Sequence, residues 1–193
     1  PTAATIAKYA RAAGVLAYVP LAFALAAMLG WAINARGLVQ IRPDLGWAPM
    51  QVTTALGIAS LALATMGYRR FAWVGVGIGA STAISYATGR PLIEALLPNH
   101  IMDKVAISGV AAPWTAVSLT LIAAGLLMPR RAKWEYASAG ACLFGSMIGL
   151  SGFGGYIGRG LEEWDGDMTM MAFNTAASLT ILGIAALLKV ATR

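Results

Sequence analysis

Charged residues, cysteine and histidine are all scarce in this sequence of 193 residues. Only 11% of the residues are charged and 59% are apolar, whereas a soluble domain carries about 25% charged residues. The single cysteine, Cys142, excludes an intramolecular disulfide. The single histidine, His100, leaves no cluster of nitrogen and sulfur ligands for a protein-built zinc or iron site. The composition predicts one membrane domain that covers 1–193.

The sequence also lacks the residue combinations of catalytic sites. It contains no Ser-His-Asp or Cys-His set and no glycine-rich phosphate loop after a strand. Every charged residue falls at or near the end of an apolar segment, whereas proton relays and ion pathways need ionisable groups within the membrane. We therefore expect neither an enzyme nor an ion-coupled transporter, and no cofactor. The net charge of +6 suits anionic lipid headgroups rather than nucleic acid.

Six segments are apolar and close to the length of about 20 residues that a membrane-spanning helix needs. They cover approximately 12–32, 48–67, 71–87, 111–128, 134–152 and 171–190. Short links join the second segment to the third and the fourth to the fifth, so the segments pair into helical hairpins. These hairpins cover approximately 12–67, 71–128 and 134–190. The predicted fold is an all-α integral membrane protein with six transmembrane helices.

The distribution of charge predicts the orientation of these helices. Nine basic residues and one acidic residue, Glu135, lie on the side of the two termini and the short links. Five basic and seven acidic residues lie on the side of the three longer loops. Lysine and arginine in short loops mark the cytoplasmic side. We expect a protein of the bacterial inner membrane with both termini in the cytoplasm.

The second segment of each hairpin opens with the same short motif. The motif reads Thr-Ala, any residue, Gly or Ser, then Ile or Leu, and it begins at Thr54, Thr115 and Thr175. The three copies are therefore about 60 residues apart. Chance recurrence is the alternative, because small residues are common in membrane helices. The ordered recurrence favours a parallel repeat of three hairpins around a pseudo-threefold axis.

The first segment of each hairpin ends with an aromatic residue, followed by Arg, Gly or Pro, and Leu. The aromatic and arginine pairs are Trp31 with Arg36, Tyr86 with Arg90, and Tyr156 with Arg159. Arginine and aromatic side chains suit the membrane interface. If the three guanidinium groups converge, they form a site for an anion or a lipid headgroup. Otherwise each pairs with a nearby carboxylate, namely Asp44, Glu94, and Glu162 or Glu163.

The segment Met171–Ala176, Met-Ala-Phe-Asn-Thr-Ala, resembles a motif in the N-terminal membrane regions of bacterial histidine kinases and diguanylate cyclases. Ala112–Ala116 resembles a second copy, and Gly30-Trp31 with Arg42-Pro43, Met50 and Thr54–Leu56 resembles a first. The resemblance covers most of the chain from about Gly30 to Leu188. It implies an input module that senses a signal at or in the membrane and passes it to a cytoplasmic catalytic domain. The sequence to Arg193 contains no such domain, so we expect a cytoplasmic effector or other membrane subunits as partners.

The loop before the sixth segment contains candidate ligands for a hard cation such as calcium, and a tryptophan, Trp164, as a further contact candidate. The candidate ligands are Glu162, Asp165 and Asp167. Their spacing is not that of an EF-hand, and a solvated outer loop is the simpler interpretation. His100 is a candidate axial ligand for a haem or pigment, although a single loop histidine is more often an ordinary surface residue.

Two functions are consistent with these features. The first is a non-enzymatic sensor-input module that binds a lipid, a small ligand or a partner protein in the membrane. The second is an accessory subunit of a larger respiratory or photosynthetic membrane complex, with its apolar face against other subunits. Gln51 and Asn174, near the outer ends of the second and sixth segments, are interpreted as helix-start residues.

Overall fold

The computed structural model describes residues 2–40, 49–90, 92, 111–129, 131–159 and 171–192. Within these ranges the chain is helical and contains no strand, so the prediction of an all-α fold is confirmed for the described residues. The long helices are α1 (Ala3–Ala32), α3 (Val52–Met66), α4 (Ala72–Thr88), α6 (Pro113–Leu127), α7 (Ala132–Arg159) and α8 (Phe173–Val190). A short helix, α2 (Arg36–Val39), follows α1, and a 3-10 turn, η2 (Arg69–Phe71), precedes α4.

One long helix corresponds to each of the six predicted apolar segments, but α1 and α7 extend beyond the predicted bounds by more than one residue. Helix α1 begins nine residues earlier than its apolar segment, after Thr2, whose hydroxyl accepts a hydrogen bond from Thr5 N at 3.3 Å. Helix α7 continues to Arg159 rather than 152. Hydropathy locates the part of a helix that suits lipid, whereas the helix itself continues into polar residues such as Lys8 and Arg11.

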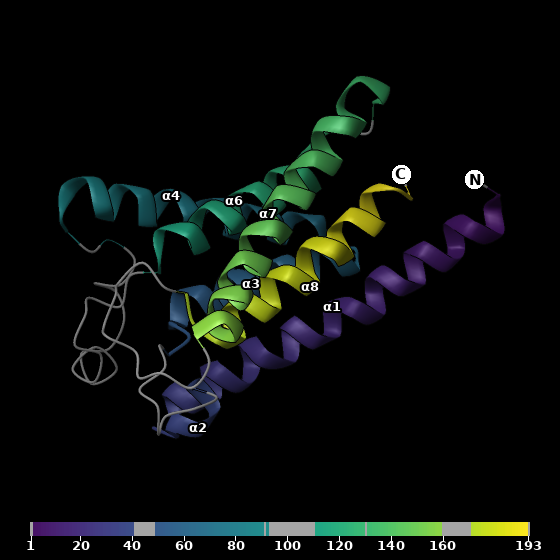
Figure 1. Cartoon of the computed structure of the whole chain (residues 1–193). Coiled ribbons are helices and arrows are strands. Elements are labelled where there is room, and N and C mark those ends of the chain that lie inside the picture. Colours follow the sequence, from purple (N-terminus) through teal and green to yellow (C-terminus); the bar gives the residue numbers. More distant parts are fainter. Residues whose placement is uncertain are drawn as a thin grey trace.

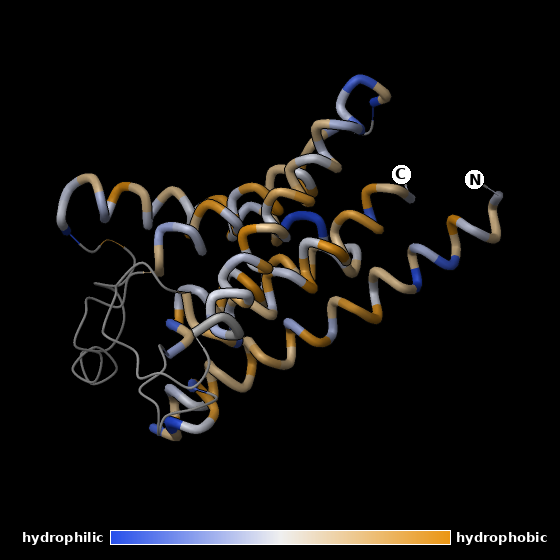
Figure 2. The backbone as a smooth tube through the Cα atoms, in the orientation of Figure 1, coloured by the Kyte–Doolittle hydropathy of each residue, from blue (hydrophilic) through white to orange (hydrophobic). Residues whose placement is uncertain are grey.

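Within the described residues, three helices are long and apolar enough to cross a membrane, namely α1, the part of α7 from Ala132 to Tyr156, and α8. Helices α3 and α6 are apolar but have only 15 residues each. At about 1.5 Å per residue they are shorter than the hydrocarbon core of about 30 Å. Figure 2 shows hydrophobic residues along all six helices and hydrophilic residues mainly near helix ends and turns.

The long helices form an inner and an outer set. The inner helices α3, α6 and α8 each contact the other two inner helices. Each inner helix also contacts two outer helices: α3 contacts α1 and α4, α6 contacts α4 and α7, and α8 contacts α7 and α1. In Figure 1, α8 lies between α1 and α7. The contact between α8 and α1 closes the arrangement, because it joins the last hairpin to the first.

The outer helices carry many of the exposed large apolar side chains. Examples are Phe23 and Leu29 on α1, Trp73 on α4, and Phe144 and Leu150 on α7. The inner helices are largely buried, with fully buried residues such as Ile58, Leu119 and Leu179 at their centre. A bundle with an apolar exterior on its outer helices suits a lipid environment.

Candidate functional site

The three inner helices begin at equivalent positions of the Thr-Ala motif. Their first residues are Val52, Pro113 and Phe173, each two residues before the motif threonine. The residue before each helix is extended, with φ and ψ of −68° and 150°, −56° and 144°, and −56° and 147°. We call this end of the bundle the motif end, and the opposite end, which contains the termini and η2, the turn end.

A matched hydrogen bond joins the two helices of the first and third hairpins at the motif end. Trp31 Nε1 donates to the carbonyl oxygen of Met50 at 2.8 Å, and the hydroxyl of Tyr156 donates to that of Met171 at 2.9 Å. Met50 and Met171 both lie four residues before the motif threonine. Two different aromatic residues, one with an N–H donor and one with an O–H donor, thus bond to the corresponding methionine carbonyl. Each bond ties the end of an outer helix to the start of its inner partner.

The aromatic residues of the three hairpins differ in exposure. Tyr156 is buried at 7% exposure, and its ring packs edge-on against Phe173 with the centroids 5.5 Å apart. Trp31 is partly buried, whereas Tyr86 is 50% exposed. Of these three candidates, Tyr86 presents the largest fraction of its surface to a lipid or partner, and Tyr156 acts mainly inside the bundle.

Glycines on the outer helices pack against the inner helices at equivalent positions. Gly79 and Gly149 both lie seven residues before the aromatic residue of their hairpin. A Cβ atom on Gly79 would lie 3.1 Å from the carbonyl oxygen of Ala116, and one on Gly149 would lie 3.0 Å from that of Ala176. Glycine is required at both positions because the backbones approach too closely for a side chain.

Glycines also pack closely against the inner helix of the preceding hairpin. These glycines, Gly75 and Gly145, lie four residues before Gly79 and Gly149. A Cβ atom on Gly75 would lie 2.8 Å from Leu61 of the first hairpin. A Cβ atom on Gly145 would lie 2.6 Å from Ile122 of the second. Leu61 and Ile122 both lie seven residues after the motif threonine. Contacts within and between hairpins therefore use equivalent residues.

Hydroxyl groups also join the helices. Ser118 Oγ donates to the carbonyl oxygen of Gly145 at 2.7 Å, which links α6 to α7. Ser146 Oγ donates to that of Thr180 at 2.9 Å, which links α7 to α8. These bonds hold the helices in register where the surroundings are apolar.

Asn174 connects the third hairpin to the first. Its side-chain nitrogen donates to the carbonyl oxygen of Val39, at the end of α2, at 3.1 Å. Asn174 lies at the start of α8, as its second residue, while Ala172 occupies the N-cap. Gln51 does occupy the N-cap of α3, but its side chain makes no capping hydrogen bond.

The sequence-predicted polar sites are described only in part. Arg36 and Arg90 are both exposed at the motif end, while the side chain of Arg159 lies outside the described residues. The convergence of the three guanidinium groups therefore stays a prediction. The remaining candidates also lie outside the described residues: His100, Glu162, Trp164, Asp165 and Asp167. Among the side chains that the structure does describe, no group of three or more His, Cys, Asp or Glu is arranged to hold a metal.

Arg69 has a structural contact that the sequence analysis did not identify. From η2, its Nε donates to the carbonyl oxygen of Leu126 at 3.1 Å, and its Nη2 donates to those of Leu127 and Met128. These carbonyls belong to the last residues of α6 and its C-cap, so the guanidinium acts as a C-terminal cap. The sequence places Arg69 in a short basic link at the turn end, but it does not show that Arg69 bonds to Leu126, which lies 57 residues further along the chain.

The described geometry thus supports packing and hydrogen bonding between hairpins, concentrated at the motif end. It also shows one charged cap at the turn end. Comparisons with protein-family models, curated proteins and solved structures found no match for this chain.

Proposed function

We propose that this chain is a non-enzymatic membrane module of the sensor-input type. All six long helices cross the bilayer as three hairpins around a pseudo-threefold axis, with the motif end outside and both termini in the cytoplasm. The observation that carries this proposal is the matched bond from Trp31 to Met50 and from Tyr156 to Met171. It supports an internal repeat because it occupies the same motif position in two hairpins that differ in sequence.

The packing glycines are a second support for the repeat. Gly79 and Gly149 meet the same position of the inner helix within a hairpin, and Gly75 and Gly145 meet the same position of the preceding hairpin. Equivalent residues that make equivalent contacts are what duplication of one hairpin would produce. The closed arrangement of inner and outer helices agrees with a threefold axis through α3, α6 and α8.

The position of α8 supports an input role. Its first turn is tied to α7 through Tyr156 and Met171, and to the first hairpin through Asn174 and Val39. A ligand, lipid or partner that displaces either hairpin at the motif end would therefore move the start of α8. A packed helix transmits such a displacement along its length, so the end of α8 near Lys189 is the proposed output towards a cytoplasmic effector.

A fusion protein tests the input role. The chain is joined after α8 to the catalytic core of a histidine kinase through linkers that lengthen one residue at a time over two helical turns. We expect autophosphorylation in nanodiscs to vary with linker length in the helical period of about 3.6 residues. In the active linkers the rate should respond to bilayer thickness. Asn174→Leu should reduce that response, because it removes the bond to Val39.

Two results would contradict the input role. One is an autophosphorylation rate that is the same for every linker length. The other is a response to bilayer thickness that Asn174→Leu leaves unchanged. Thr180→Val is the matched control on α8, because the Thr180 hydroxyl bonds only to Ala176 O within its own helix.

The topology is tested with single cysteines. With Cys142 replaced by alanine, cysteines at Arg70 or Thr192 should resist a membrane-impermeant maleimide in intact cells and react after lysis. Cysteines at Arg36 or Arg90 should react in intact cells. Labelling of Arg70→Cys from outside would contradict the proposed orientation.

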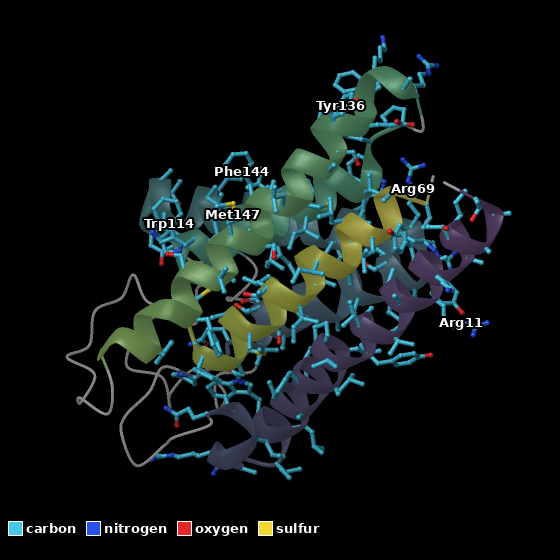
Figure 3. The ribbon with its side chains drawn as sticks, turned by 45° about the vertical axis from the view of Figure 1, so that its right-hand side comes forward. Arg11, Arg69, Trp114, Tyr136, Phe144 and Met147 are labelled. Carbon is cyan, nitrogen blue, oxygen red and sulfur yellow. The ribbon has the colours of Figure 1, made fainter. Side chains whose placement is uncertain are left out.

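An accessory subunit of a larger membrane complex is the second candidate, and the outward face of α7 favours it. Tyr136, Phe144 and Met147 are 90%, 63% and 54% exposed and lie along that face (Figure 3). Such a surface suits either lipid or another membrane subunit. Purification in mild detergent separates the two: co-purification with other membrane subunits at fixed stoichiometry supports the accessory subunit, whereas a chain that migrates alone supports the sensor.

A further inference from the structure

Four hydroxyl groups are buried without a hydrogen-bond partner in the described part of the chain: Thr53 Oγ1, Ser81 Oγ, Thr82 Oγ1 and Ser178 Oγ. The first three belong to α3 and α4. Thr53, Ser81 and Thr82 are 2%, 7% and 1% exposed. A buried hydroxyl that bonds to nothing is unfavourable, so three such groups on one pair of helices require a partner.

The packing of α3 against α4 places these hydroxyls at the same level. A Cβ atom on Gly57 of α3 would lie 3.3 Å from Cδ1 of Ile78 of α4. The two helices are antiparallel, so Thr53 lies four residues towards the motif end from Gly57, and Thr82 lies four residues towards it from Ile78. Both are therefore about one turn beyond the same contact.

Two further serines belong to the same part of α4. Ser81 precedes Thr82, and Ser85 follows one turn later. Ser85 is 4% exposed, and its hydroxyl accepts a hydrogen bond from Leu92 N at 3.3 Å. We call the part of the α3–α4 interface formed by Thr53, Ser81, Thr82 and Ser85 the hydroxyl seam.

The two equivalent interfaces of the bundle lack this cluster. At the interface of α8 with α1, Asn174 occupies the position that corresponds to Thr53, and it is bonded to Val39. The position that corresponds to Thr82 is occupied by Ala27. At the interface of α6 with α7, Trp114, which is 57% exposed, corresponds to Thr53, and Gly152 corresponds to Thr82. Helix α3 also packs less extensively on α4 than the other inner helices pack on their equivalent outer neighbours.

The two helices that form the hydroxyl seam are uncharged and mostly apolar. Neither α3 nor α4 contains an Asp, Glu, Lys or Arg residue. Leu56 lies three residues after Thr53 and Ile84 three residues after Ser81, so each shares a side of its helix with a seam residue. They are 41% and 48% exposed. A molecule in the seam would meet hydroxyl groups at one point and an apolar surface beside them.

We infer that the hydroxyl seam binds an uncharged amphiphile from the bilayer, with a carbonyl or hydroxyl head group. The head group bonds to Thr53, Ser81 and Thr82, which provide both donors and acceptors. The alkyl body lies along Leu56 and Ile84. This site is the ligand site of the sensor-input module and in that sense rests on the proposed function, but its occupancy is a separate property.

Two photoactivatable probes test the site on the full chain in phosphatidylcholine nanodiscs. One is a long-chain alcohol that carries a diazirine, and the other is the hydrocarbon of the same length without the hydroxyl. Peptide mass spectrometry locates the label. We expect the alcohol to label α3 and α4 at the seam about tenfold more than the hydrocarbon, the ratio that one or two net hydrogen bonds provide. Equal labelling by the two probes would overturn the inference.

Variants test whether the hydroxyls cause that preference. T53V with T82V keeps the side-chain shape and should reduce alcohol labelling to the hydrocarbon level. T65V is the matched control, because Thr65 is also buried on α3 but its hydroxyl bonds to the carbonyl oxygen of Leu61 at 2.9 Å. S81A is a milder second variant and should lower the preference in part. A preference that T53V with T82V and S81A leave unchanged would show that these hydroxyls bind only water, and would overturn the site.

The labelling result is independent of the kinase fusion. Preferential labelling of the seam, together with a fusion that does not respond, would remove the proposed function and leave the site. A responsive fusion without preferential labelling would remove the site and leave the proposed function.

Discussion

The inner helices α3, α6 and α8 and the outer helices α1, α4 and α7 are built from similar apolar residues but are used differently. In an apolar stretch of 18 residues, 56% of the residues of α8 are buried inside the bundle, compared with 28% in α1 and in α7. The inner helices bury small and hydroxyl-bearing residues such as Ala55, Ser118 and Ala176. The outer helices expose large residues outward and turn glycines inward. The two sets therefore differ in whether their large side chains are buried inside the bundle or exposed on its outside.

The proposed lipid surroundings explain why the two sets of helices differ. In a bilayer, lipid tails are as apolar as leucine, so helix association depends on close packing and on hydrogen bonds between helices. Glycine at the contact allows both, because it brings a backbone within reach of a neighbouring hydroxyl. Gly145 shows this directly: its backbone carbonyl accepts the hydrogen bond from Ser118, and its missing side chain makes room for Ile122. Five substitutions, in four experiments, test how far the two sets differ.

The largest effect is expected for Gly149→Leu, on the inward side of α7. A Cβ atom there would lie 2.7 Å from Thr180 N, so the substitution separates α7 from α8. Overpacking of this kind should lower the free energy of unfolding by about 3 kcal/mol. Unfolding in mixed micelles with increasing SDS, followed by circular dichroism, measures this. Gly140→Leu on the same helix has no atom within 4 Å of its Cβ and should cost far less. An equal loss in both variants would contradict the packing role.

Arg69→Met removes the cap of α6 and should have the second largest effect. Hydrogen bonds to charged groups contribute about 1.5–3 kcal/mol, and the exposure of Arg69 places its contribution near the lower value. The same unfolding measurement applies. The control is Arg70→Met, since Arg70 lies over the Phe71 ring, 5.8 Å from its centroid, and is exposed. If Arg70→Met proves as costly as Arg69→Met, the cap does not stabilise the bundle.

Tyr156→Phe and Trp31→Phe test the matched bond at the motif end. Each removes one hydrogen bond and leaves a carbonyl oxygen without that donor, so each should cost about 1 kcal/mol. In Tyr156→Phe the ring contact with Phe173 is retained, which separates the hydrogen bond from the packing. Tyr136→Phe is the control, because Tyr136 is 90% exposed. If either variant costs no more than Tyr136→Phe, the bond at that position does not stabilise the motif end and the case for a repeat is weakened.

The smallest effect is expected for Phe144→Leu, on the outward face of α7. Phe144 is 63% exposed, so it exchanges one apolar surface for another and the free energy of unfolding should change by less than about 0.5 kcal/mol. In a larger membrane complex, the same substitution would alter a surface that contacts another subunit. A marked loss of co-purifying subunits in Phe144→Leu would favour the accessory subunit.

Much of the motif end was visible in the sequence, although its contacts were not. The repeat pattern marked Trp31 and Tyr156 as equivalent and placed Met50 and Met171 in equivalent segments. It did not reveal that the indole N–H of Trp31 and the hydroxyl of Tyr156 donate to the carbonyl oxygens of these methionines, because the partners are 19 and 15 residues apart in the chain. The sequence placed Asn174 at a helix start but did not reveal its hydrogen bond to Val39, because the two residues are 135 positions apart.

For the described residues, the sequence alone determined that the fold is helical and approximately where its six long helices lie, and it showed which residues recur from one pair of apolar segments to the next. Hydropathy and short motifs are local, and a helix satisfies its backbone hydrogen bonds within its own segment. Only the tertiary structure decided which helices are inner, how Arg69 caps α6 and which hydroxyls of α3 and α4 are buried without a hydrogen-bond partner. Those features depend on which faces meet. In an apolar chain that choice follows from the fit of glycines and side chains across helices rather than from hydropathy.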